Sequence, residues 1–219
     1  MKSHARSFFF IATAVILLFS AMILHAEENR LQFNSAKHFK IVQFTDTHFY
    51  KGGPRSQEVL DNIKSVMDAE KPDLVILTGD IVTGKPTLKS WEILTDLLIA
   101  YQVPYAITFG NHEDEAETSR EELLKYLSAR PYCLLSDDGG TTVLGVGNYV
   151  LPLYNQEGTA EKLIYCMDSR SYSLAKDQGV DGWGWFDHSQ IRWFAESNQA
   201  WLRRIDGKIL YKVELPRKK

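Results

Sequence analysis

Three short polar segments follow three apolar runs at nearly even spacing, and this pattern constrains the fold more than any other feature of the chain. The segments are Asp46-Thr47-His48, Gly79-Asp80 and Gly110-Asn111-His112-Glu113, so Asp46, Asp80 and Asn111 lie 34 and 31 residues apart. Such intervals match one strand–helix–strand unit of roughly 30 residues. Because successive parallel strands present their carboxyl ends at one edge of a sheet, where ligands bind in open α/β folds, we expect these polar side chains to lie together.

The segments between and after these polar tips predict an α/β fold with two sheets. The apolar runs predict buried parallel strands over residues 40–45, 74–77 and 103–109. Helices are predicted to begin at Pro54, at Pro86 and near Ser119, where Ser119 and Glu122 have the spacing of a capping box. The later chain alternates apolar and turn residues, and it predicts further strands over 132–135, 142–146, 149–154 and 163–168, then a helix from Ser189. These strands are expected to form a second sheet beside the first.

The N-terminal segment predicts export. Residues 8–24 carry no charge, follow the basic Lys2 and Arg6, and precede the small residue Ala26. This is typical of a secretory signal peptide over residues 1–26, so we expect a periplasmic or secreted protein. A retained membrane anchor over residues 8–24 is the alternative, and only that alternative predicts association with a membrane.

Charge and cysteine content limit the functional classes. The formal net charge of −3 disfavours nucleic acid as a partner. Cys133 and Cys166 are the two cysteines, and their spacing leaves open whether they form a disulfide or remain two buried thiols.

The residue types at the three polar tips suit a dinuclear metal centre. Asp46 and His48 are two positions apart and can reach one ion, while Asp80 on the middle strand has two oxygens with which to bridge two ions. Asn111 offers a neutral oxygen to the second ion, which leaves His112 to act on a leaving group as a proton donor or a charge stabiliser. Mixed imidazole and oxygen ligands favour iron, manganese or zinc over calcium or magnesium. Two ions about 3.5–4 Å apart can hold both oxygens of a phosphate displacement.

Other conspicuous residues have simpler interpretations. His38 and His188 are expected at the surface, and the acidic run Glu113–Glu117 is expected to be a solvated face near a helix N-terminus. Aromatic packing in the core is favoured over a ligand pocket for the tryptophans of the later chain, which are Trp183, Trp185, Trp193 and Trp201.

The motifs resemble the calcineurin-like metallophosphoesterase superfamily, and within it the single-domain branch related to purple acid phosphatases. VQFTDTHF, LVILTGDIVTG and ITFGNHEDE are similar to the three metal motifs of that family, and GWGWFDHSQIRWF is similar to its segment before a late helix. The resemblance implies a four-layer αββα sandwich over residues 36–202, followed by a basic tail over 203–219. True purple enzymes carry a tyrosine ligand where this chain has Thr83, which implies a non-purple enzyme.

The same resemblance implies roles for the site residues. Asp46, His48 and Asp80 would hold the first of two divalent or trivalent metal ions, Asp80 and Asn111 would hold the second, and His112 would assist the leaving group. The implied reaction is attack of a metal-bound hydroxide on a phosphate monoester or diester, without a covalent enzyme intermediate. A phosphorylated substrate of unspecified identity is therefore the expected partner.

One departure from the family pattern gives a competing expectation. The family completes its metal site with later histidines, including a G-H-x-H pair, whereas no histidine follows His188 in this sequence. The chain is therefore expected to be incomplete at its C-terminal end relative to the family. The alternative function is an inactive, truncated phosphoesterase-like domain.

Overall fold

The computed structural model describes residues 30–204, with side chains described to Trp201. The segment from Gln32 onward forms one compact unit, to which the following description applies. The predicted signal peptide over 1–26 lies outside the described residues, as does the predicted tail over 203–219 apart from its first two residues, which end a helix. Within the described part of the chain, none of the helices is long and apolar enough to cross a bilayer.

The first sheet contains the three strands that the polar tips follow. These strands are β1 (Ile41–Phe44), β2 (Leu74–Thr78) and β3 (Tyr105–Thr108), and both β1 and β3 pair in parallel with β2. The central strand is covered on both faces, as its continuous apolar run predicts, because Leu74, Val75 and Leu77 are fully buried. This arrangement confirms the predicted parallel sheet and places the three strand ends at one edge.

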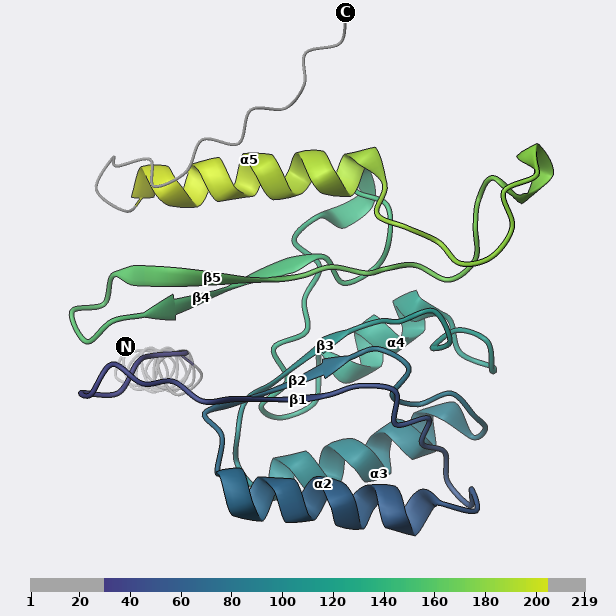
Figure 1. Cartoon of the computed structure of the whole chain (residues 1–219), viewed down its shortest axis with the longest axis horizontal. Coiled ribbons are helices and arrows are strands. Elements are labelled where there is room, and N and C mark those ends of the chain that lie inside the picture. Colours follow the sequence, from purple (N-terminus) through teal and green to yellow (C-terminus); the bar gives the residue numbers. More distant parts are fainter. Residues whose placement is uncertain (1–29, 205–219) are drawn as a thin grey trace, which may run out of the picture. The chain divides into compact units, whose positions relative to one another are not determined.

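Helices cover the first sheet. α2 (Ser56–Glu70) and α3 (Thr87–Ala100) lie side by side on its outer face (Figure 1). α4 (Arg120–Leu127) begins with the predicted capping box, in which the Ser119 hydroxyl accepts the N–H of Glu122 and the Glu122 carboxylate accepts the N–H of Ser119. All three predicted helix starts are close to the observed ones.

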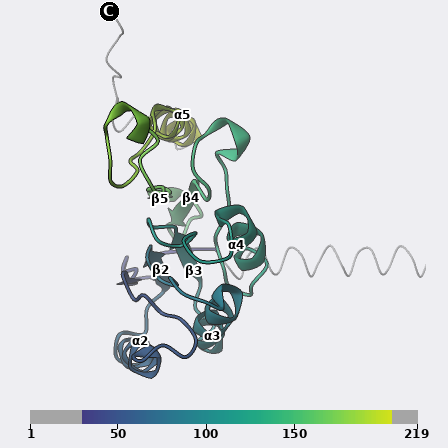
Figure 2. The same cartoon turned by 90° about the vertical axis from the view of Figure 1, so that its right-hand side faces the viewer.

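The second sheet is a hairpin covered by the last helix. β4 (Tyr149–Tyr154) and β5 (Ala160–Cys166) pair antiparallel, and α5 (His188–Arg204) lies on their outer side (Figure 2). The Tyr165 ring of β5 makes edge contacts with two aromatic rings of α5. The order helices, sheet, sheet, helix is the predicted αββα arrangement.

Two of the predicted strands are wrong. Residues 132–135 contribute an isolated parallel bridge between Cys133 and Tyr105, and residues 142–146 run through a 3-10 turn (Gly140–Thr142) and a loop. The reason is local, because Gly145 and the nearby Gly147 have φ angles of +88° and +82°, and Tyr132, at the start of the other segment, has a φ of +62°. Glycine reaches this left-handed region without strain, whereas a strand needs an extended backbone.

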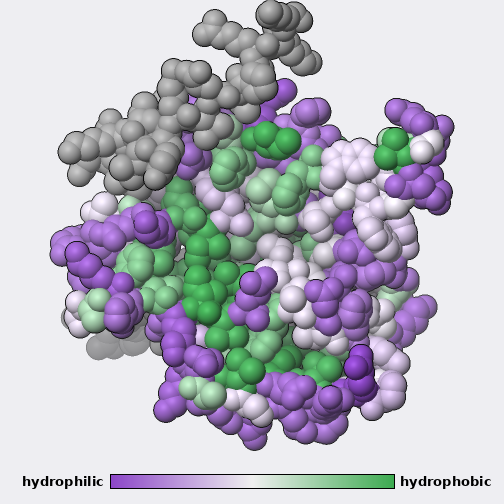
Figure 3. Space-filling view, in the orientation of Figure 1, coloured by the Kyte–Doolittle hydropathy of each residue, from purple (hydrophilic) through white to green (hydrophobic). Residues whose placement is uncertain are grey.

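A hydrophobic strip crosses the middle of one face, over the region of the strands, and hydrophilic side chains border it (Figure 3). The first residue of β1, Ile41, is 42% exposed.

Between the sheets, the buried Tyr149 hydroxyl accepts the N–H of Ile107 and donates to its carbonyl. The second sheet therefore forms polar contacts with the backbone of β3 as well as apolar ones.

Candidate metal centre

Three of the predicted ligands come together at the carboxyl edge of the first sheet. Asp46 and His48 lie in the loop after β1, and Asp80 lies two residues after the end of β2. One ligand atom from each of the three residues lies within 4.8 Å of the other two. Two carboxylates and an imidazole at this spacing fit one metal ion, and iron, manganese and zinc accept such mixed ligands.

The backbone turns these side chains toward one another. Asp46, His48 and Asp80 all have positive φ angles, of +52°, +45° and +53°. The N–H groups of Asp46 and His48 donate to the carbonyls of Gly79 and Asp80 at 3.1 and 2.9 Å, so the two loops remain paired beyond the end of the sheet. Non-glycine residues in this conformation cost energy and concentrate at functional sites.

Two glycines allow the loops after β2 and β3 to approach closely. A Cβ atom on Gly79 would stand 2.6 Å from the Cα of Gly110, and a Cβ on Gly110 would stand 2.8 Å from the backbone nitrogen of Asp80. Neither contact is possible without displacement of the backbone. Glycine at both positions therefore sets the position of Asp80.

The third loop brings His112 beside the cluster. The N–H of His112 donates to Oδ1 of Asp80 at 3.0 Å, and its Nε2 lies 4.0 Å from Oδ2 of the same carboxylate. The His48 and His112 rings are 5.8 Å apart. Asn111, which precedes His112 on this loop, is half-buried, and its carbonyl accepts a hydrogen bond from the Ser171 hydroxyl. The predicted site residues thus lie on three adjoining loops, with Asp80 on the middle one.

Hydrogen bonding orients the His112 ring. Its Nδ1 lies 2.6 Å from a carboxylate oxygen of Glu115. Burial alone would lower the pKa of His112, but the bond to Glu115 and the charge of Asp80 outweigh it and raise the pKa above its ordinary value. The Nδ1–H therefore points to Glu115, while Nε2 faces the cluster. His48 is oriented in a similar way by Thr83, whose hydroxyl lies 3.3 Å from Nδ1.

The expectation that the acidic run is a solvated face is wrong for its first residue. Glu113 is 1% exposed, and its carboxylate accepts the N–H of Ile81 at 2.8 Å and that of Gly110 at 2.7 Å. Burial raises the pKa of Glu113 to about 7, against the backbone N–H groups that lower it. Glu113 is thus a buried support that ties together the loops after β2 and β3. In the sequence, only its position directly after Asn111 and His112 indicated that Glu113 belongs to the site.

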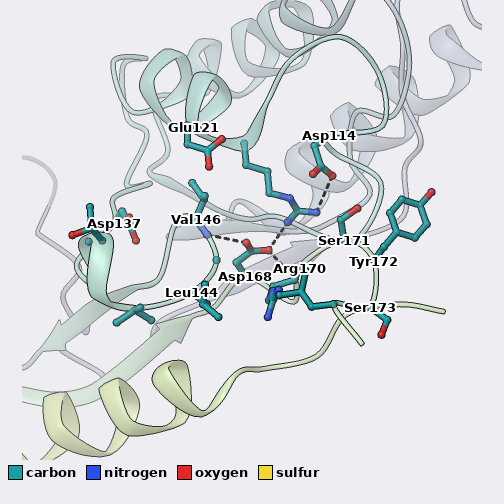
Figure 4. A pocket seen from close by; sticks show the side chains of 16 residues that line it. Asp114, Glu121, Asp137, Leu144, Val146, Asp168, Arg170, Ser171, Tyr172 and Ser173 are labelled. Carbon is teal, nitrogen blue, oxygen red and sulfur yellow. Dashed lines mark hydrogen bonds and ion pairs between the residues drawn. The ribbon is translucent and has the colours of Figure 1, made fainter. Parts of the chain in front are cut away.

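A buried ion pair between Arg120 and Asp168 supports the loop after β3. Arg120, at the start of α4, donates to Asp168, to Asp114 and to the carbonyl of Gly110. Asp168 is 1% exposed and also accepts the N–H of Val146. The side chains of Arg120, Asp114 and Asp168 line a pocket of about 640 Å³, in which Asp168 lies centrally and Asp114 at one side (Figure 4). Sequence reasoning missed Arg120 and Asp168, because they lie 48 residues apart and neither belongs to a recognisable motif.

The expectation of aromatic core packing is wrong for Trp183. This side chain is 50% exposed, and its ring meets that of His112 edge-on at 5.0 Å and stacks on that of Tyr172 at 5.2 Å. Trp185 is 51% exposed, whereas Trp193 packs on β5 as expected. His38 and His188 are exposed, as predicted.

Comparisons with known proteins agree with this geometry. Residues 39–213 match the family described as calcineurin-like phosphoesterase. The phosphatase DCR2 of Saccharomyces cerevisiae is 29% identical over 203 residues, which cover 81% of this chain and 34% of that protein. "Probable inactive purple acid phosphatase 28" of Arabidopsis thaliana is 30% identical over 208 residues, which cover 80% of this chain and 52% of that protein. The matched segments thus span about a third to a half of these relatives.

A solved structure shows the same fold at low sequence identity. The crystal structure of a dimetal phosphatase from Danio rerio aligns with a TM-score of 0.51 and 14% identity, covering 74% of this chain and 65% of that one. The family match extends over most of the chain and includes all three polar loops. The chain therefore belongs to the calcineurin-like phosphoesterase family.

Proposed function

We propose that the protein hydrolyses phosphate monoesters or diesters at a dinuclear metal centre on the carboxyl edge of its first sheet. The observation that carries this proposal is the convergence of Asp46, His48 and Asp80 with His112 beside them. The names of its relatives, which include a phosphatase and a dimetal phosphatase, support the same reaction class.

In this proposal Asp46, His48 and Asp80 hold the first metal ion, and Asp80 and Asn111 contribute to the second. Bound metal ions would supply a more acidic water ligand and positive charge for the phosphoryl oxygens. The fit is best for the first ion, since its three donor groups already converge. The donor chemistry again favours iron, manganese or zinc.

His112 is the proposed proton donor to the leaving oxygen. Its Nδ1–H is held by Glu115, so Nε2 is the nitrogen that faces Asp80 and the reacting group. A positioned acid of this kind contributes typically about 10²–10⁴-fold to the rate. Glu115 acts through His112 by fixing the ring orientation.

An inactive phosphoesterase-like domain is the second candidate. Three Arabidopsis thaliana relatives carry "probable inactive" in their names. Among the residues that the structure describes, Asp46, His48 and Asp80 are the group of acidic, histidine or cysteine side chains that could hold an ion. In that case the loops would be preserved without a complete second metal site.

Metal analysis combined with hydrolysis separates the two candidates. We expect the full chain, refolded with manganese, iron or zinc, to bind close to two ions and to hydrolyse p-nitrophenyl phosphate or its bis ester. Asp80→Asn should lower kcat/KM by about 100-fold or more, because metal ions contribute several kcal/mol to such reactions. Asp61→Asn, on the exposed side of α2, is the matched control. One weakly bound ion or none, without hydrolysis, would establish the inactive domain.

Export through residues 1–26 also remains a proposal, as does the alternative of a retained anchor. N-terminal sequencing of the protein from the producing cell would test it. A mature chain that starts near Glu27 supports export, whereas an intact N-terminus supports the anchor.

A further inference from the structure

We propose that Trp183 and Tyr172 form an aromatic wall beside His112, and that this wall selects phosphate esters whose alcohol carries an aromatic ring. The inference rests on the proposed function, because it assigns the leaving group of the same reaction to one side of the site. Neither residue belongs to the three polar loops, and both come from the segment between β5 and α5.

The two rings are exposed although they are large and contact each other. Trp183 is 50% exposed and Tyr172 is 52% exposed, and their rings stack at 5.2 Å with an interplanar angle of 28°. The Trp183 ring also meets the His112 ring edge-on at 5.0 Å. A stacked pair that leaves half of its surface open next to a candidate acid has room for another ring, and aromatic pairs gain energy beyond simple burial.

The wall is held in place from several sides. Residues 171–184 fold back on themselves, with the N–H of Ser173 donating to Gly182 and that of Gly184 donating to Ser171. The Tyr172 hydroxyl donates to one oxygen of Glu115, whose other oxygen holds Nδ1 of His112. Figure 4 shows Tyr172 at the side of the pocket, with its ring directed away from Asp168. The wall and the candidate acid thus share one carboxylate, and such preorganisation lowers the entropy lost on binding.

The position of His112 determines which part of a substrate would meet the wall. If its Nε2 protonates the leaving oxygen, the alcohol that departs lies on the His112 side of the phosphoryl group. Trp183 is on that side, in contact with the His112 ring. The Glu115 carboxylate, which contacts both Tyr172 and His112, disfavours additional negative charge on this alcohol. The expected alcohol is therefore aromatic and either neutral or cationic.

Binding of matched phosphonates tests the wall without requiring turnover. Benzylphosphonate and cyclohexylmethylphosphonate have similar size and the same charge, and they differ in the aromatic ring. We expect the full-length, manganese-loaded protein to bind benzylphosphonate about 3- to 10-fold more tightly in isothermal titration calorimetry. Trp183→Leu should abolish this preference and Trp183→Phe should retain part of it. Trp185→Ala, which removes another half-exposed tryptophan of the segment, should leave the preference unchanged.

Hydrolysis then distinguishes this inference from the proposed function. Benzyl phosphate and cyclohexylmethyl phosphate release similar alkoxides, so the preference should be found in KM. If the protein prefers AMP to ribose 5-phosphate by as large a factor as it prefers benzyl phosphate, the aromatic group is a nucleobase. If it does not prefer AMP, the aromatic group belongs to a simpler aryl alcohol. Tighter binding of benzylphosphonate without any hydrolysis would support the aromatic wall and contradict the proposed hydrolysis. Equal binding of the two phosphonates, or binding of neither, would overturn the inference whether or not hydrolysis occurs.

Discussion

Glu113 joins two loops through a single carboxylate. We expect Glu113→Ala to lower the free energy of unfolding of the metal-free protein by about 2–4 kcal/mol, because each buried N–H left without an acceptor costs about 1–3 kcal/mol. These are the N–H groups of Ile81 and Gly110. Glu113→Gln keeps one acceptor oxygen and should lose less. Urea unfolding measures both changes, with the exposed Glu58→Ala as the control. A loss no larger than that of the control would contradict this role.

The two cysteines provide a second test at the residue scale. Cys133 and Cys166 are free thiols, and burial raises the pKa of each to about 11. The thiolate is the reactive form, so the native protein should react slowly with a thiol reagent at pH 8, and faster only as the pH rises toward 11. In urea both thiols should react at once. Absence of reaction in urea would instead reveal the disulfide that the sequence leaves open.

At the scale of the elements, the ends of β2 and β3 must approach closely. Gly110→Ala places a Cβ atom against the backbone nitrogen of Asp80 and should displace the carboxylate that both metal ions are proposed to share. We expect metal content and hydrolysis to fall together. Gly140→Ala is the control, since its Cβ meets nothing within 4 Å and its positive φ costs only about 1–2 kcal/mol of stability. Normal metal content in Gly110→Ala would show that the loops can separate without loss of the site.

The elements that the sequence predicts well are those with a strong local pattern. The strands β1, β2 and β3 have apolar runs, and α4 has its capping box, so each is identifiable from adjacent residues. The strand predicted over residues 142–146 is wrong because apolar residues that alternate with glycine resemble a strand, whereas the positive φ angles of Gly145 and Gly147 produce a loop. Whether an acidic residue of 113–117 is buried or exposed depends on the tertiary fold and not on the local composition.

At the scale of the whole molecule, the sequence identified the edge of the sheet that carries the candidate metal ligands, but it did not identify the residues that support their loops. Asp46, His48 and Asp80 converge as expected, because parallel strands share one carboxyl edge. The ion pair between Arg120 and Asp168 depends on how the second sheet packs on the first, and this packing leaves no periodic signal. The same holds for the aromatic contact between His112 and Trp183.

The contact between the sheets depends on Tyr149 in particular. This buried side chain of β4 is hydrogen-bonded through its hydroxyl to both the N–H and the carbonyl of Ile107 in β3, at 2.9 and 2.8 Å. Tyr149→Phe removes the hydroxyl but keeps the ring, so it leaves two buried backbone groups without this partner. We expect a loss of about 1–3 kcal/mol in the free energy of unfolding.

Tyr50→Phe is the matched control, because water can replace the partner of a hydroxyl on a side chain that is 36% exposed. Chemical denaturation of the two variants compares them directly, and hydrogen exchange at Ile107 reports the local effect. If the Tyr149 hydroxyl couples the sheets, exchange at Ile107 accelerates while β1, at the far side of the first sheet, keeps its protection. Equal stability of the two variants would mean that apolar packing alone holds the sheets together. In that case the loops of the candidate metal centre would depend on the first sheet and its own helices, and the segment between β5 and α5 would contribute mainly the aromatic wall and Asp168.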